Sequence, residues 1–351
     1  MRSRPERRVS FPGCEGAYVR VQDDLRKTVV FLGHETSDPA KGGIDCFGTG
    51  FLLHHKEVPY LITCRHVAEA VGNDPFLIRL NTYRGDSRNV LTDQVKWYFH
   101  PNPNVDVAVI PFNVPKDHGY DCFYFTEDIF IPASEIGIGE FCYTVGLFRL
   151  LAGRKRNLPV VHFGTIAMVP GDETIPVMDW RDQSGQTTIQ AHGYLVESQS
   201  LDGLSGAPVM VRPSFDGPRV PAYAPGGAKS IIEVGPKLAR HEVFLLGMWQ
   251  GAWDAPPDQI LAIEKGEDVR VSVGMGVVIP GEHIRDTLDQ EELEKMRKTE
   301  NLRVRTAARL ETSRVANASK SSSDATDENP NAQEDFKSLV NAAAQKQKPA
   351  E

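Results

Sequence analysis

The sequence lacks paired cysteines, an excess of basic charge and long apolar runs. Its 351 residues include five cysteines, an odd number with no C-x-x-C pair. A disulfide framework and a cysteine zinc site are therefore disfavoured, and free buried thiols are expected. The formal net charge of -8 gives no general attraction to nucleic acid.

Apolar stretches are also too short for a membrane span, which needs about 18 consecutive apolar residues. The N-terminal stretch MRSRPERRVSFPG is basic, but no apolar run of signal-peptide length follows it. We therefore expect a cytoplasmic protein with no membrane partner and no nucleic-acid partner. Its oligomeric state is left open.

Short β-branched or aromatic runs, separated by Gly, Pro, Asn and Asp, dominate the chain from residue 26 to residue 280. Six lie in the first half, at 26–33, 48–55, 58–64, 76–83, 93–99 and 106–112. Six more lie in the second half, at 140–148, 160–169, 193–199, 206–213, 243–251 and 273–280. This pattern predicts an all-β fold of two closed six-stranded antiparallel β-barrels, because closure leaves no exposed strand edge.

The same pattern divides the chain into five parts. They are a flexible N-terminus (1–22), an N-terminal barrel (23–130), a C-terminal barrel (131–281), a C-terminal helix (282–311) and a disordered tail (312–351). The tail is expected to be disordered because it has few apolar residues to offset its ordering entropy. Two long polar connections, 170–192 and 214–242, are expected to be surface insertions that shape the substrate site or are disordered.

Three segments carry residue types that suit acyl transfer by a serine. His66 follows the apolar run LIT and opens a short helical run, Asp106 opens the apolar run DVAVI, and Ser205 lies in the small-residue loop DGLSGAP. A serine nucleophile needs a base to take its proton and a carboxylate to orient that base. We therefore predict His66, Asp106 and Ser205 as catalytic residues, with the amides of Gly203 and Ser205 as oxyanion donors.

Two of these residues, His66 and Asp106, also have an ordinary structural interpretation. His66 is one of ten histidines, most of which are expected on the surface or satisfied in the core. Asp106 stands between a loop and a strand, where aspartate commonly caps a turn. The occurrence of all three motifs in one order favours a catalytic site.

In this arrangement the sequence resembles the trypsin-like serine peptidase family. The pattern G-x-S-G-x-P at 203–208 is most similar to its bacterial Deg-type and related cytoplasmic branches. GTGF at 48–51 and GMGVVIP at 274–280 also resemble family elements. The resemblance covers about residues 26–290, and implies a chymotrypsin-like fold with His66 as base, Asp106 as orienting carboxylate and Ser205 as nucleophile.

The resemblance also implies a substrate-binding strand. The run FLLGMWQG, which ends at residue 251, is similar to the strand that pairs with the substrate backbone. The expected substrate-binding residues are Gly247, Met248, Trp249, Gln250 and Gly251.

The sequence departs from zymogen-type relatives at the residue before the nucleophile. In those relatives an aspartate there pairs with an N-terminal amine that cleavage frees, and here the residue is Leu204. We therefore expect activity without N-terminal cleavage. Flanking paired cysteines and a PDZ module are also missing, so secretion and PDZ-gated assembly are not implied.

The predicted function is a serine endopeptidase that acts on a polypeptide substrate through an acyl-enzyme, with no cofactor and no metal. The alternative is a catalytically inactive protease-fold module that binds partners or acts as a scaffold. An α/β-hydrolase is disfavoured because GAPVMVRP, and not a helix, follows Ser205. A phosphate-binding loop at 226–230 is disfavoured because Ala228 stands where such a loop needs glycine.

Overall fold

The computed structural model describes residues 21–299, apart from 73, 94, 116–118, 172, 183–186, 214–219, 224–228, 233–242 and 256–270. The chain divides into one unit of residues 1–290 and a second of residues 291–351. Most of the predicted flexible N-terminus and the whole predicted tail, 312–351, lie outside the described residues. All of the predicted site residues lie in the first unit.

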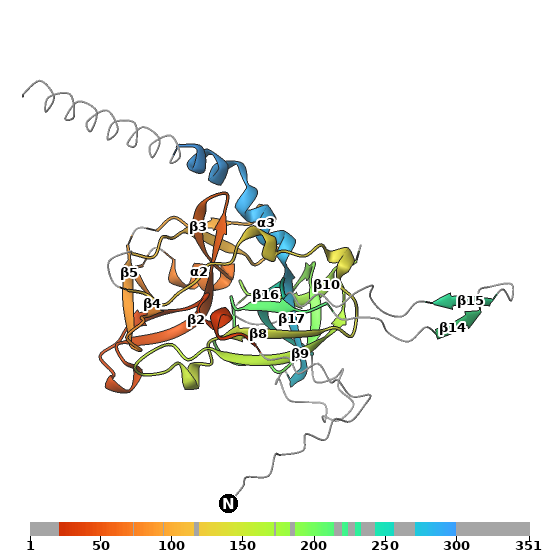
Figure 1. Ribbon diagram of the computed structural model, residues 1–351, viewed down its shortest axis with the longest axis horizontal. Coiled ribbons are helices and arrows are strands. Elements are labelled where there is room, and N and C mark those ends of the chain that lie inside the picture. Colours follow the sequence, from red (N-terminus) through yellow and green to blue (C-terminus); the bar gives the residue numbers. More distant parts are fainter. Residues whose placement is uncertain are drawn as a thin grey trace, which may run out of the picture. The chain divides into compact units, whose positions relative to one another are not determined.

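The first half of that unit forms a seven-stranded antiparallel sheet (Figure 1), in the order β5-β4-β1-β2-β3-β7-β6. Its strands are β1 (Val29–Glu35), β2 (Ile44–His55), β3 (Val58–Thr63), β4 (Phe76–Asn81), β5 (Ser87–Thr92), β6 (Tyr98–Phe99) and β7 (Ala108–Pro111). The predicted closed six-stranded barrel is not confirmed here, because β5 and β6 stand at the two ends of the described sheet. The sequence pattern missed β5 because SRNVLT is mostly polar and five of its six residues are at least partly exposed.

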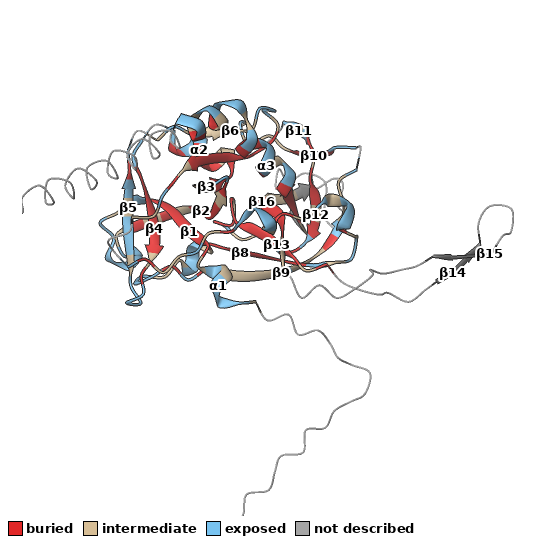
Figure 2. Cartoon of the chain, turned by 45° about the horizontal axis from the view of Figure 1, so that its top comes forward, coloured by how far each residue is buried: buried red, intermediate tan, exposed pale blue. Residues whose placement is uncertain are grey.

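The second half forms the predicted closed barrel of six strands, in the order β12-β17-β16-β13-β8-β9. The strands are β8 (Phe141–Gly146), β9 (Val160–Met168), β12 (Tyr194–Glu197), β13 (Pro208–Val211), β16 (Phe244–Ala255) and β17 (Val271–Pro280). Apolar side chains from these strands, including Ile166, Val209 and Trp249, pack in one buried cluster. Figure 2 shows this buried interior in red.

Two hairpins lie in the connections that were expected to be surface insertions. Residues 170–192 contain β10 (Ile175–Met178) and β11 (Thr188–Ala191), and the second connection contains β14 (Val220–Tyr223) and β15 (Lys229–Ile232). The first hairpin is anchored on the barrel, because its Ile175, Val177 and Ala191 pack with Val277 of β17. It is therefore an ordered wall of the molecule.

The helical elements are short. They are α1 (Asp23–Arg26), α2 (Arg65–Val71), α3 (Gly281–Asp289) and the 3₁₀ turns Pro39–Lys41, Glu127–Ile129, Ala133–Glu135 and Arg149–Leu151. The predicted C-terminal helix is present but breaks at Gln290, whose ψ of 147° is extended, before residues 291–299 turn helical again. No helix in the described residues combines the length and the apolar content needed to cross a membrane.

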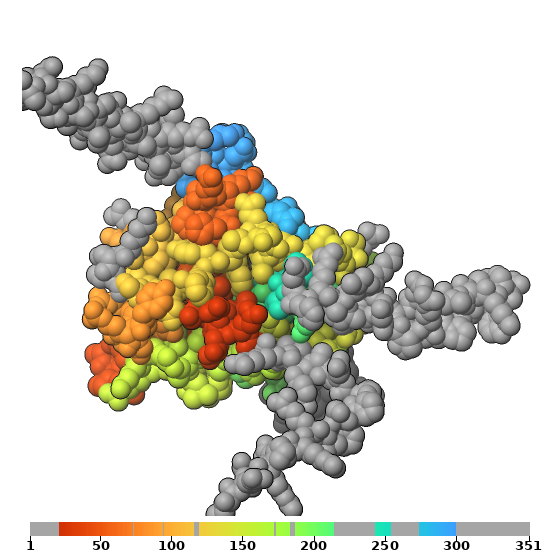
Figure 3. All heavy atoms as spheres, viewed as in Figure 1, coloured from red at the N-terminus to blue at the C-terminus, as the bar shows by residue number. Residues whose placement is uncertain are grey.

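The segment that follows β7 contacts both halves. On the sheet side, the Phe125 amide donates to the Leu52 carbonyl, and the Phe125 carbonyl accepts from the His54 amide. On the barrel side, Phe130 forms a β-bridge with Leu245. Figure 3 shows this yellow segment on the molecular surface beside the orange and red N-terminal strands. It helps to hold the sheet and the barrel together around the site described next.

Candidate active site

His66 and Asp106 are brought together by two adjacent strands. β3 pairs with β7 in an antiparallel register that places Thr63 opposite Ala108. The end of β3, which leads into α2 with His66 in its first turn, therefore lies beside the start of β7, just after Asp106. The Arg65 amide donates to the Asp106 carbonyl and fixes this corner.

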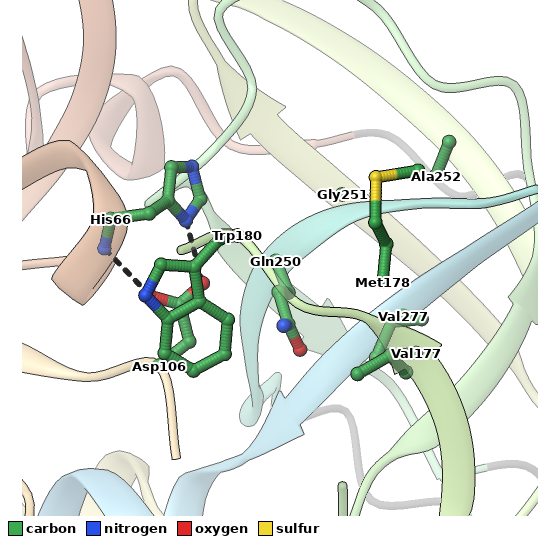
Figure 4. Close-up of a pocket in the computed structure, with 9 residues that line it drawn as sticks. All are labelled: His66, Asp106, Val177, Met178, Trp180, Gln250, Gly251, Ala252 and Val277. Carbon is green, nitrogen blue, oxygen red and sulfur yellow. Dashed lines mark hydrogen bonds and ion pairs between the residues drawn. The ribbon is translucent and has the colours of Figure 1, made fainter. Parts of the chain in front are cut away.

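The Asp106 carboxylate is almost fully buried, with 1% of its surface exposed, and both of its oxygens bind His66. Oδ2 lies 2.6 Å from the imidazole Nδ1, and Oδ1 accepts from the His66 backbone amide at 2.8 Å. Figure 4 shows both bonds as dashed lines. This geometry fixes the orientation of the ring and directs Nε2 away from Asp106.

Two opposing effects act on the protonation of His66. Burial disfavours the charged imidazolium, but the charge and hydrogen bond of Asp106, together with the charge of Glu69, outweigh it and raise the pKa of His66 above its ordinary value. A histidine with a raised pKa is a stronger base, so Asp106 both orients His66 and increases its affinity for a proton.

The loop that carries Ser205 depends on two glycines with positive φ. Gly203 has a φ of 99°, and a Cβ there would lie 2.8 Å from the Leu147 side chain. Gly206 has a φ of 87°, and a Cβ there would lie 2.1 Å from the carbonyl oxygen of Thr49. Only glycine fits either position, so the G-x-S-G spacing is required by the backbone.

Two carbonyl hydrogen bonds fix the peptide groups that would form an oxyanion hole. The Asp202 carbonyl accepts from the Arg149 amide at 3.0 Å, and the Leu204 carbonyl accepts from the Ala207 amide at 2.8 Å. In a trans peptide the N–H points opposite to the C=O, so the amides of Gly203 and Ser205 point away from these bonds. Within the part of the chain that the structure describes, neither amide donates a hydrogen bond.

Ser205 shares a cavity of about 340 Å³ with His66, Asp202 and Gly203. Its hydroxyl does not donate to His66 within the described residues, and instead donates to the Gln250 carbonyl at 3.1 Å. The structure thus places the predicted nucleophile and base at one cavity, without a hydrogen bond between them.

A second cavity, of about 240 Å³, is also lined by His66, together with Asp106. Figure 4 shows Trp180 and Gln250 beside the histidine–aspartate pair, and apolar side chains at the opposite end. These apolar residues are Val177, Met178, Ala252 and Val277. The β10–β11 hairpin supplies the first two of them, so the predicted insertion at 170–192 borders this cavity.

The expected substrate-binding residues fall into two groups. Met248 lies between Pro208 of β13 and Ile279 of β17, and both its side chain and that of Trp249 are buried. Gly247 packs against the Ile279 backbone, with no room for a Cβ. Only Gln250 and Gly251 of the five line the cavity beside His66.

Cys64 adds a third possible metal ligand beside His66 and Asp106, since one ligand atom of each lies within 4.8 Å of the others. Burial, with the nearby charge of Asp106, raises the pKa of the Cys64 thiol well above its ordinary value. The thiol donates to the Trp249 carbonyl at 3.3 Å. This thiol is therefore protonated and structural, and the carboxylate is already occupied by His66.

Thr49 supports the loop that carries Ser205, a role that the sequence motifs did not indicate. Its side chain is fully buried, and its hydroxyl donates to the Gly203 carbonyl at 2.7 Å. The signal was present in the GTGF motif, but the contact spans 154 positions in the sequence.

Comparisons with known proteins add a likeness to solved structures. No protein-family model matches the chain, and no curated protein matches it. Among solved structures, the chain is similar to the Rv3671c protease in its inactive form, with 15% identity over 75% of this chain and 88% of that one and a TM-score of 0.40. The active form of the protease from M. tuberculosis gives 15% identity over 75% and 80% of the two chains, with a TM-score of 0.40. At this degree of likeness, function has to be inferred from the site itself.

Proposed function

We propose that the protein is a serine endopeptidase of the trypsin-like type, in which Ser205 attacks, His66 accepts the proton and Asp106 orients His66. One observation supports this most directly: the buried Asp106 carboxylate binds both the ring and the amide of a histidine that shares a cavity with Ser205. Buried carboxylates are rarely unpaired, and this pairing leaves Nε2 of the histidine for chemistry.

The proposed reaction proceeds through an acyl-enzyme. As Ser205 Oγ forms a bond to the carbonyl carbon of the scissile peptide, its proton moves to His66 Nε2, and the carbonyl oxygen takes up the negative charge. The amides of Gly203 and Ser205 would stabilise that charge. His66 then gives its proton to the leaving amine as the C–N bond breaks, and water repeats the sequence to release the acid.

This reaction requires Ser205 to change its hydrogen-bond partner. The hydroxyl has to leave the Gln250 carbonyl and reach His66 Nε2. We propose that the Ser205 side chain rotates to do so, because Ser205 and His66 border one cavity. Catalytic hydrogen bonds are often long or misaligned until substrate binds.

The cavity beside His66 suggests the substrate class. The side chains of Val177, Met178, Trp180 and Val277 give it an apolar wall, and among the described residues Asp106 is the one acidic residue that lines it. We propose a polypeptide substrate with an apolar side chain close to the scissile bond.

The four described cysteines are free thiols, which suits the reducing cytoplasm expected for this chain.

A fluorophosphonate probe tests the proposal, because it reacts only with an activated serine. The intact protein should become labelled at Ser205, as read by peptide mass spectrometry, and the Ser205→Ala and His66→Ala variants should not. A folded protein without labelling at Ser205 would support the scaffold alternative, in which the hydroxyl stays on Gln250.

A further inference from the structure

A second cluster of ligand-type side chains lies at the start of α3, away from Ser205. His192 stands in the turn between β11 and β12, and its Nδ1 lies 3.0 Å from Nε2 of His283. The same Nδ1 lies 3.7 Å from Oε1 of Glu282. One ligand atom from each of these three residues lies within 4.8 Å of the other two.

These distances suit a divalent metal with tetrahedral ligands. Zinc binds histidine nitrogen and carboxylate oxygen at about 2.0–2.2 Å, which places neighbouring ligand atoms of a tetrahedron about 3.3–3.6 Å apart. The two measured separations, 3.0 and 3.7 Å, lie on either side of that range. Two imidazoles favour zinc over magnesium or calcium, which prefer oxygen ligands.

We propose that His192 Nδ1, His283 Nε2 and the Glu282 carboxylate bind one zinc ion, with a water molecule as the fourth ligand. Each of the three residues offers a ligand atom of a type that zinc accepts, two imidazole nitrogens and one carboxylate oxygen.

The remaining nitrogen of His283 supports the same assignment. Its Nδ1 is buried and, among the described residues, has no hydrogen-bond partner. A ligating histidine usually donates its other N–H to a carboxylate or carbonyl. Asp286, one helical turn after Glu282, has a carboxylate oxygen within 4.8 Å of a His283 nitrogen, so the same helix carries an acceptor close to this ring.

The position of the cluster indicates what the metal would do. His192 directly follows Ala191, the last residue of the hairpin that borders the apolar cavity, whereas Glu282 and His283 lie in the first turn of α3. Zinc would tie the base of that hairpin to the helix. The proposal depends on this geometry alone, and is independent of the proposed peptidase activity.

Zinc titration of the untagged, chelator-treated full chain tests the proposal, with a chromophoric chelator as competitor. We expect one equivalent of zinc per chain, with binding weakened at least 10-fold in His192→Ala and Glu282→Gln. Both side chains are partly exposed, at 30% and 47%, so neither change should unfold the protein. His162→Ala, a partly buried histidine of β9, is the matched control and should bind zinc as the parent does.

Three outcomes would overturn the assignment. They are no zinc binding by the folded parent, binding lost in His66→Ala but retained in His192→Ala, and binding lost in His100→Ala but retained in His192→Ala. Cobalt in place of zinc distinguishes the proposed site from the group formed by Cys64, His66 and Asp106, because only that group contains a thiol. A thiolate-to-cobalt charge-transfer band would place the ion at Cys64 and contradict the proposal, whereas a tetrahedral visible spectrum without that band supports it.

Discussion

The Thr49 hydroxyl donates a 2.7 Å hydrogen bond to the Gly203 carbonyl and accepts another, at 2.9 Å, from the Leu147 amide. Thr49 belongs to β2 of the N-terminal sheet, whereas Leu147 follows β8 and Gly203 precedes β13 of the closed barrel. Its backbone amide also donates to the Ser205 carbonyl at 3.0 Å. One buried threonine thus holds the loop of the proposed nucleophile in position.

Thr49→Val keeps the shape of the side chain but leaves a buried carbonyl and a buried amide without their partner. We expect a loss of about 1–3 kcal/mol in the free energy of unfolding, together with a fall in kcat. Urea unfolding and peptidase kinetics measure the two effects. Thr92→Val is the control, because its buried hydroxyl donates to the Phe76 carbonyl in the N-terminal sheet. Equal loss of kcat in both variants would show that Thr49 acts only through stability.

Removal of any member of the proposed triad should abolish peptide hydrolysis. Ser205→Ala and His66→Ala should each lower kcat by a factor of about 10⁴ or more, because triad residues act as a unit. Asp106→Asn should lower kcat by a comparable or somewhat smaller factor. Steady-state kinetics measure these changes, with circular dichroism as the check on folding. A silent Asp106→Asn would mean that another acid orients His66.

The raised pKa of His66 predicts the pH dependence. His66 accepts a proton only when neutral, so kcat/KM should rise with pH through a pKa above the ordinary value of about 6.5. Stability should move the opposite way: the pair's contribution to the free energy of unfolding is complete below the ordinary pKa and is lost as pH rises through the raised one. NMR titration of His66 in Ser205→Ala should show that pKa, and Asp106→Asn should lower it.

N-terminal cleavage should be unnecessary for activity. Leu204 is fully buried in the barrel core and cannot pair with an amine, while the Arg149 amide already holds the Asp202 carbonyl. Intact protein and protein cleaved after residue 20 should therefore label at Ser205 with equal rates. Labelling of the cleaved form alone would identify a zymogen and refute this argument.

The apolar cavity should control substrate choice. Met178→Asp puts a charge among Val177, Trp180 and Val277, and should raise KM for peptides with apolar side chains near the scissile bond while kcat changes little. A peptide library profiled on both proteins measures the shift. Leu151→Asp, at an exposed position on the rim of another cavity, is the control. An unchanged profile would place substrate side chains elsewhere.

The sequence predicted those parts of the fold whose patterns are local. The six barrel strands are runs rich in β-branched and aromatic residues, separated by Gly, Pro and polar residues, so the closed barrel could be predicted. The order of His66, Asp106 and Ser205 resembles that of trypsin-like peptidases. The structure brings His66 and Asp106 into contact and places Ser205 at a cavity with His66, and their catalytic roles stay a prediction. The β10–β11 hairpin was missed because polar residues and Gly dominate its connection. Trp249 was placed in the substrate strand, but its environment depends on the register of β16 between two other strands, which no local pattern encodes.

The hydrogen bond from Ser205 to the Gln250 carbonyl could make the reactivity of Ser205 depend on substrate binding. An extended peptide that adds to β16 at Gln250 would bring an amide able to compete for that carbonyl. Until such a peptide arrives, the hydroxyl would spend part of its time on the Gln250 carbonyl, where it would react only slowly with small esters or probes. Binding of an extended backbone would favour the rotamer that faces His66, so the proposed peptidase would act faster on polypeptides than on small esters.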